Sequence, residues 1–247
     1  MGFVEGSAEP KFPPLLTGHK STDPAGPFRQ AQTGAGEQRL GAGDLIWSID
    51  ETQLRFAIVL EPEVDRQRCH EILFVLMVAF ADAFGATAPP EVEMTYEWPN
   101  KFLANGAEVG SARLALANQE IDGIPQWMVI ALSIRMAPRR GDPEPGHDRS
   151  RTTMWDEGCA SISAVSLLEA TARHFLAWVH GWEEDGFKGI HQTWSQRLAM
   201  GKRYECDYQG RRVAGEPLGL DEHGGLLVRQ PDNTEILHLP AMMRPTQ

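Results

Sequence analysis

Residues 66–84 constrain the fold most strongly, because they predict a helix with one wide apolar face. Asp65 is suited to cap the start of this helix, Gly85 can follow its end, and Pro89-Pro90 prevent its continuation. Its most apolar stretch, residues 72–81, has about half of the roughly 20 residues that a membrane span needs. We therefore predict a buried helix that crosses the back of a sheet.

Apolar and alternating runs on both sides of this helix predict strands. The predicted strands are residues 44–48, 54–60, 92–98, 101–104, 107–117 and 127–134. Asn105-Gly106 is a typical type I′ turn between two of them. Helical spacing predicts further helices at residues 166–182 and 189–200. This order of elements predicts an α+β domain around an antiparallel-rich sheet.

The pattern changes after Gly201, where short strands alternate with turn residues. These predicted strands are residues 203–208, 211–220, 225–230 and 234–238. They predict a small β-barrel or meander that docks on the first domain. We accordingly expect two domains, residues 1–198 and 199–247.

Composition limits the classes of binding partner and the cellular compartment that we expect for this protein. The formal net charge of −11 disfavours nucleic acid and anionic membranes as partners. Three widely spaced cysteines do not suggest a disulfide framework, and residues 1–14 lack the pattern of a signal peptide. We expect a cytoplasmic protein, and histidine spacing predicts no metal site.

Several motifs occur in an order that resembles the biotin/lipoate protein ligase family. They are Ser21-Thr22-Asp23, the segment Glu97-Trp98-Pro99-Asn100 with the hairpin and Gly110 that follow it, the strand at residues 129–135, residues 152–158, and the glycines and Asp221 of the C-terminal strands. The resemblance covers residues 15–240. It implies a sheet like those of class II aminoacyl-tRNA synthetases and biotin synthetases, with a C-terminal SH3-like β-barrel.

The resemblance also implies a function and a site. Such ligases activate biotin or lipoate with ATP and magnesium and transfer the acyl group to a lysine of a carrier-protein domain. The matching positions here are the expected ligand-binding residues: Ser21, Thr22, Asp23, Trp98, Asn100, Lys101, Gly110 and Arg135. Ser21–Asp23 are equally suited to a turn or helix cap, and Trp98 is equally suited to a core. We expect a monomer or a homodimer.

Two family features are missing from the sequence. The family has an Arg- and Gly-rich loop after its first strand, whereas residues 49–53 contain Asp50 and Glu51 and no Arg or Gly. The family also has a lysine in the hairpin before the glycine, where this chain has Glu108. Lys101 and Arg135 are candidates to replace the lost positive charge. A ligase with reduced activity and a non-catalytic protein that binds a ligand or a carrier domain therefore both remain open.

Cys159 gives a third alternative. Lipoyl and octanoyl transferases, which resemble these ligases, use a cysteine from a Cys-Gly pair as the acyl-carrying nucleophile, and here the order is Gly158-Cys159. A Cys159-dependent acyltransferase would need a lowered thiol pKa. The opposing interpretation is a small buried side chain.

Overall fold

The computed structural model describes residues 9–142, 144 and 147–242. The expectation about a signal peptide therefore falls largely outside the described residues. The main sheet has seven strands in the order β1-β2-β3-β9-β6-β5-β4. Its strands are β1 (Thr17–Lys20), β2 (Asp44–Ile49), β3 (Gln53–Leu60), β4 (Met94–Glu97), β5 (Lys101–Ala104), β6 (Ala107–Leu116) and β9 (Met128–Arg135). Only the β1–β2 pair is parallel, so the predicted antiparallel-rich sheet is confirmed.

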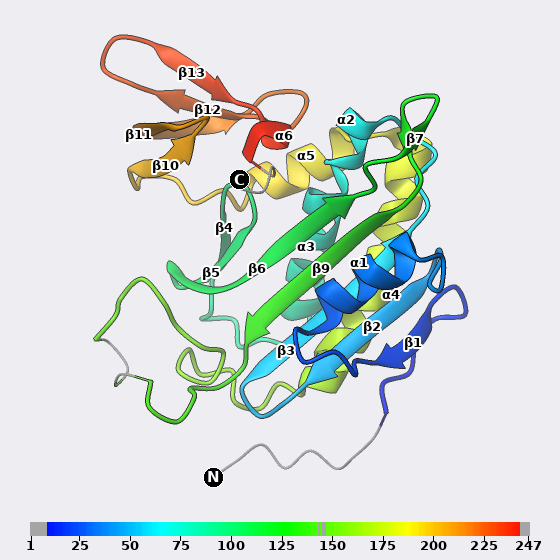
Figure 1. Cartoon of the computed structure of the whole chain (residues 1–247). Coiled ribbons are helices and arrows are strands. Elements are labelled where there is room, and N and C mark those ends of the chain that lie inside the picture. The colour runs from blue at the N-terminus through cyan, green and yellow to red at the C-terminus, as the bar shows by residue number, and fades with distance from the viewer. Residues whose placement is uncertain (1–8, 143, 145–146, 243–247) are drawn as a thin grey trace.

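Helices cover the two faces of the sheet unequally (Figure 1). The helices are α1 (Pro27–Gly36), α2 (Arg66–Cys69), α3 (Ile72–Gly85), α4 (Ala164–Asp185), α5 (Lys188–Ser195) and α6 (Leu239–Met242). The face that packs against α3 and α4 forms the large hydrophobic core. On the other face, Ala31 and Ala35 of α1 pack on a smaller cluster from β2, β3 and β9. Among the described residues, no helix other than α1 is seen on this second face (Figure 1).

The predicted helix at residues 66–84 is divided into α2 and α3. His70 and Glu71 lie between them, and their amides bond to the carbonyls three residues earlier, at Gln67 and Arg68. Such i→i+3 bonds tighten the backbone beyond α-helical geometry. The prediction that this segment crosses the back of the sheet is confirmed, because all but two residues of α3, Asp82 and Gly85, are buried.

The strand β1, the two strands β7 and β8, and the short helix α6 were not predicted. β1 has a polar sequence and mostly exposed side chains, so it shows no strand alternation. The hairpin of β7 (Glu120–Ile121) and β8 (Ile124–Pro125) is too short to show a pattern. The sequence predicts a helical turn or two at residues 29–32, and α1 is longer because its small residues pack closely on the sheet.

The C-terminal strands form a four-stranded antiparallel sheet in sequential order. They are β10 (Tyr204–Tyr208), β11 (Arg211–Leu220), β12 (Leu226–Arg229) and β13 (Thr234–Leu237). Within the described residues, the first and last of these strands do not pair, so this SH3-like sheet is an open meander. Gly224 lies against Phe74 of α3, and a Cβ atom there would be 2.6 Å from its ring. No helix among the described residues is long and apolar enough to cross a membrane.

Candidate functional site

A row of polar side chains crosses the sheet on the face that carries α1. Directly paired residues of neighbouring antiparallel strands lie on the same face. The pairs form one continuous series, which we call the polar row: Ser48, Arg55, Ser133, Ser111, Lys101 and Glu97. Ile46, Ala57 and Ala131 are each two residues from a member of the row, and they pack in the cluster with α1. Since side chains alternate along a strand, the row faces the same side as α1.

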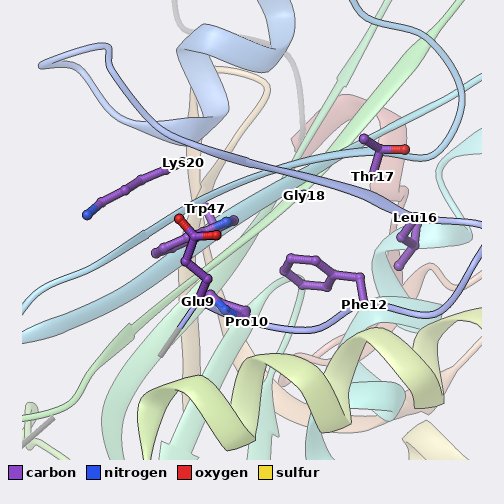
Figure 2. Close-up of a pocket in the computed structure, with 8 residues that line it drawn as sticks. All are labelled: Glu9, Pro10, Phe12, Leu16, Thr17, Gly18, Lys20 and Trp47. Atoms are coloured by element: carbon purple, nitrogen blue, oxygen red, sulfur yellow. The ribbon is translucent and has the colours of Figure 1, made fainter. Parts of the chain in front are cut away.

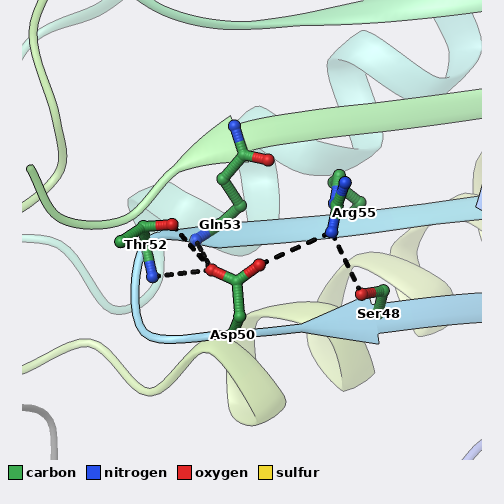
Figure 3. Close-up of polar contacts among 5 residues, drawn as sticks. All are labelled: Ser48, Asp50, Thr52, Gln53 and Arg55. Carbon is green, nitrogen blue, oxygen red and sulfur yellow. Dashed lines mark hydrogen bonds and ion pairs between the residues drawn. The ribbon is translucent and has the colours of Figure 1, made fainter. Parts of the chain in front are cut away.

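The short turn between β2 and β3 is closed by one carboxylate (Figure 3). Asp50 Oδ1 accepts hydrogen bonds from the Thr52 amide at 2.8 Å, the Thr52 hydroxyl at 2.7 Å and the Gln53 amide at 2.9 Å. Burial opposes the ionised form of Asp50, but these bonds and the charge of Arg55 outweigh it and lower the pKa of its carboxyl. The turn therefore satisfies its own polar groups and carries a negative charge.

Arg55 lies beside this turn with unused hydrogen-bonding capacity (Figure 3). Its Nη2 atom is 3.3 Å from Ser48 Oγ and 3.5 Å from Asp50 Oδ2. Both distances exceed the roughly 2.7–2.9 Å that is usual for charge-assisted hydrogen bonds. Its Nε atom is buried and has no hydrogen-bond partner, while 33% of the side chain is exposed. Sequence reasoning missed Arg55, although it is the one charged residue within residues 54–60.

The predicted residues Ser21, Thr22 and Asp23 gather around a side chain of α1. Gln30 Oε1 accepts hydrogen bonds from Ser21 Oγ at 3.0 Å, the Thr22 amide at 2.9 Å and the Asp23 amide at 3.2 Å. Asp23 Oδ1 accepts from the Ala25 amide at 2.8 Å, as in an Asx turn. The Ser21 amide continues the pairing of β1 with β2 by donating to the Trp47 carbonyl. These contacts match the turn interpretation and place the segment beside the Ser48 end of the polar row.

Lys101 and Arg135 lie on the same face as α1, but both already bond to other groups of the chain. Lys101 Nζ is 2.6 Å from Glu97 Oε1 and 3.6 Å from Glu108 Oε2. Burial opposes the charge of Lys101, but the two carboxylates outweigh it and raise the pKa of its ammonium group. Arg135 Nε donates to the Thr152 carbonyl at 2.9 Å, and its Nη2 atom donates to the Glu108 carbonyl. Burial lowers the pKa of the Arg135 guanidinium.

Trp98, Asn100 and Gly110 have structural contacts. Trp98 is 1% exposed and donates from Nε1 to the Gly224 carbonyl at 2.9 Å. Asn100 Nδ2 donates to the Ala112 carbonyl at 2.7 Å. Gly110 permits two strands to approach, because a Cβ atom there would be 2.3 Å from the Ser133 carbonyl oxygen. These contacts do not bring the three residues together as one group on the polar row.

Cys159 is fully buried within the large core. Burial raises the pKa of its thiol, and the nearby carboxylates Glu157 and Glu91 add to the effect. A nucleophilic thiolate requires the opposite shift. The surroundings of Cys159 thus favour the interpretation as a buried side chain.

A separate cavity of about 340 Å³ opens at the β1 edge of the sheet (Figure 2). Its lining includes Phe12, Leu16 and Trp47, which belong to or pack against the large core. Trp47 and Ser48 are neighbours on β2 and point to opposite faces. This cavity therefore lies on the other side of the sheet from the polar row.

Comparison with known proteins gives consistent matches over most of the chain. The model of the biotin/lipoate A/B protein ligase family matches residues 12–196. Biotin--[acetyl-CoA-carboxylase] ligase from Paracoccus denitrificans is 25% identical over 193 residues, covering 77% of this chain and 80% of the relative.

Solved structures agree with this match. A biotin protein ligase-like protein of unknown function from a Silicibacter species is 34% identical, with a TM-score of 0.84 and coverage of 96% of this chain and 100% of that chain. Biotin protein ligase from Aquifex aeolicus in complex with biotin and ATP shares the fold, with 16% identity, a TM-score of 0.68 and coverage of 90% and 94%. As its ordered motifs predict, this chain belongs to the biotin/lipoate A/B protein ligase family.

Proposed function

We propose that this protein binds a small acyl compound of the biotin or lipoate class on the sheet face beside α1, and that it holds the ligand without converting it to an acyl adenylate. The polar row is the observation that carries the proposal. Its serines at positions 48, 111 and 133 are neither fully buried nor fully exposed. Hydroxyl groups on a rigid sheet can accept and donate hydrogen bonds to a ligand's polar groups.

The residues near the β2–β3 turn do not fit the triphosphate of ATP. Adenylate formation brings a carboxylate next to a polyphosphate, which requires cations and free backbone amides. The turn instead presents Asp50, and the amides of Thr52 and Gln53 are bonded to it. Lys101 and Arg135 bond to groups of the chain itself, and Arg55 is a single guanidinium that lies beside the opposing charge of Asp50. These contacts support binding without activation.

Magnesium is the other cofactor that the resemblance implies. The described residues contain no group of three or more His, Cys, Asp and Glu side chains that could hold a metal ion. Because magnesium in nucleotide sites is bound largely through phosphates and water, its presence depends on the nucleotide. The proposed binding function therefore includes no step at ATP or magnesium.

A carrier-protein domain is the partner class suggested by the Paracoccus relative, whose name includes acetyl-CoA carboxylase. Transfer to a carrier lysine needs an activated acyl group. The proposal therefore predicts no acylation of a carrier domain by this protein, with or without ATP.

Calorimetric titration with biotin, lipoate and octanoate, combined with ATP–pyrophosphate exchange, tests the proposal. Binding of at least one compound without exchange supports it. The Ser133→Leu variant places a large side chain on the polar row and should abolish binding, whereas Leu218→Ala, on an exposed residue of β11, should retain it. Ligand-dependent exchange, or no binding of any compound, would contradict the proposal.

A further inference from the structure

We infer that Arg55, together with Ser48 and Ser133, binds the carboxylate of the acyl ligand. This inference rests on the proposed function and deepens it, because it limits the ligand to an organic acid. It also assigns a specificity-determining role to a residue that lies outside every motif of the family resemblance.

The basic side chains on the face that carries α1 differ in the partners that they already have. Lys101 bonds to Glu97, and Arg135 bonds to two backbone carbonyls. Arg113 lies over the Phe28 ring of α1, at 4.2 Å from its centroid. Among these side chains of the described structure, Arg55 is the one with a buried Nε atom that lacks a partner.

The shape of the Arg55 guanidinium group also favours a carboxylate ligand. Nε and the neighbouring terminal nitrogen form a fork that matches the two oxygens of a carboxylate. The Nη2 atom lies 3.3 Å from Ser48 Oγ and 3.5 Å from Asp50 Oδ2. Because these contacts are long, a ligand that forms a shorter hydrogen bond can replace them. A third of the Arg55 side chain is exposed, whereas its Nε atom is buried, so a ligand carboxylate would meet Nε only after the groups that cover it move aside.

The positions of Ser48 and Ser133 add two possible hydroxyl donors for the same carboxylate. Ser48 and Ser133 are the direct neighbours of Arg55 on the flanking strands. Adjacent strands are about 4.8 Å apart, so both hydroxyls lie within reach of an anion placed over Arg55. A carboxylate there would meet one guanidinium and up to two hydroxyl donors.

Asp50 provides a competing carboxylate. Its Oδ1 atom is fixed by Thr52 and Gln53, and its Oδ2 atom is left as the weak partner of Arg55. A ligand carboxylate would take the place of this contact and would be repelled by the Asp50 charge. Removal of that charge should therefore tighten the binding of an acid.

Matched acid and amide pairs provide the test: octanoate with octanamide, lipoate with lipoamide, and biotin with biotinamide. Because hydrogen bonds to charged groups are the stronger class, we expect the protein to prefer the acid by about ten-fold or more. Arg55→Met should remove the preference, because acid binding should fall by about ten-fold or more whereas the amide loses at most a weaker hydrogen bond to a neutral acceptor. Asp50→Asn should strengthen acid binding and leave amide binding unchanged. Arg113→Met, on the same face, serves as the control and should keep the preference.

The outcomes separate the two proposals. Equal affinity of the wild-type protein for acid and amide, or an Arg55→Met variant that keeps the preference, overturns the inference and leaves the proposed function standing. Binding of none of the six compounds overturns both. If Arg55→Met fails to fold, Ser48→Ala and Ser133→Ala replace it, since each should weaken acid binding several-fold more than amide binding, and an equal effect on both overturns the inference.

Discussion

Trp98 Nε1 donates a 2.9 Å hydrogen bond to the carbonyl oxygen of Gly224, which joins the end of β4 to the turn between β11 and β12. The Trp98 ring also meets Tyr204 of β10 edge-on, with 6.2 Å between the ring centroids. A tryptophan of the family motif thus links the main sheet to the C-terminal sheet.

Replacing Trp98 with Phe should destabilise the protein by about 1–3 kcal/mol, because the buried Gly224 carbonyl would lose its hydrogen bond. Urea unfolding followed by circular dichroism measures the change. Leu218→Ala is the control, since it lies on the surface of β11 and should change stability by no more than about 0.5 kcal/mol. A Trp98→Phe variant as stable as the wild type would show that this contact does not stabilise the protein.

Gly110→Ala should destabilise the protein by about 1–3 kcal/mol, since the added methyl group would push against the backbone of β9. The matched control is Gly181→Ala, within α4, where an added Cβ atom has no neighbour within 4 Å. This second substitution should stabilise the protein by about 1 kcal/mol through helix propensity. Thermal unfolding measures the stability change of each variant. A stability change of the same sign in both variants would contradict the packing role of Gly110.

Glu71→Gln should stabilise the protein at neutral pH. Burial raises the pKa of the Glu71 carboxyl, although the Trp182 Nε1 donor at 2.6 Å and the charge of Arg68 oppose the effect. The folded state therefore holds a proton more tightly than the unfolded state, and stability is lost as pH rises through the raised folded pKa. Gln can still accept from Trp182.

Stability curves between pH 4 and pH 8 test this prediction. The advantage of Glu71→Gln should be largest at the alkaline end and should shrink toward about pH 4, where the wild-type carboxyl is protonated in both states. Glu222→Gln, on an exposed side chain, is the control and should follow the wild-type curve. If Glu71→Gln were less stable than the wild type at pH 8, the predicted direction of the stability change would be wrong.

The three cysteines should differ in reactivity with iodoacetamide. Cys206 is partly exposed, whereas Cys69 and Cys159 are buried. Burial raises the pKa of all three thiols, that of Cys69 to about 12, so exposure is what sets Cys206 apart. Mass spectrometry should find Cys206 labelled first in the native protein and the other two after denaturation. Rapid labelling of Cys159, or its acylation by octanoyl thioesters, would revive the acyltransferase alternative.

Much of the fold could be predicted because its strands alternate and its turns carry distinct residues. Asn105-Gly106 predicts one hairpin correctly. The bounds of its two strands, β5 and β6, agree with the predicted bounds to within one residue. β1 escaped prediction because it pairs through its backbone while its side chains stay polar and mostly exposed. The division into two domains at residue 198 stays a prediction.

The site was harder to predict because it depends on register. Ser133 is far in the sequence from Ser48 and Arg55, which are seven residues apart on one hairpin, and all three are ordinary residues in their own strands. Cross-strand pairing makes them neighbours, and no motif encodes that pairing. The motif residues were easier to find, yet Trp98 and Gly110 are explained by packing. The roles of the predicted ligand-binding residues stay predictions.

The self-contained turn at Asp50 also bears on the speed of ligand exchange. The amides of Asp50, Thr52 and Gln53 already have partners, so these residues need not become ordered when a ligand arrives. Binding would avoid the entropic cost of fixing a loop, and release would not wait for a cover to lift. We expect association close to the rate of a simple encounter and a residence time governed by the contacts on the sheet alone.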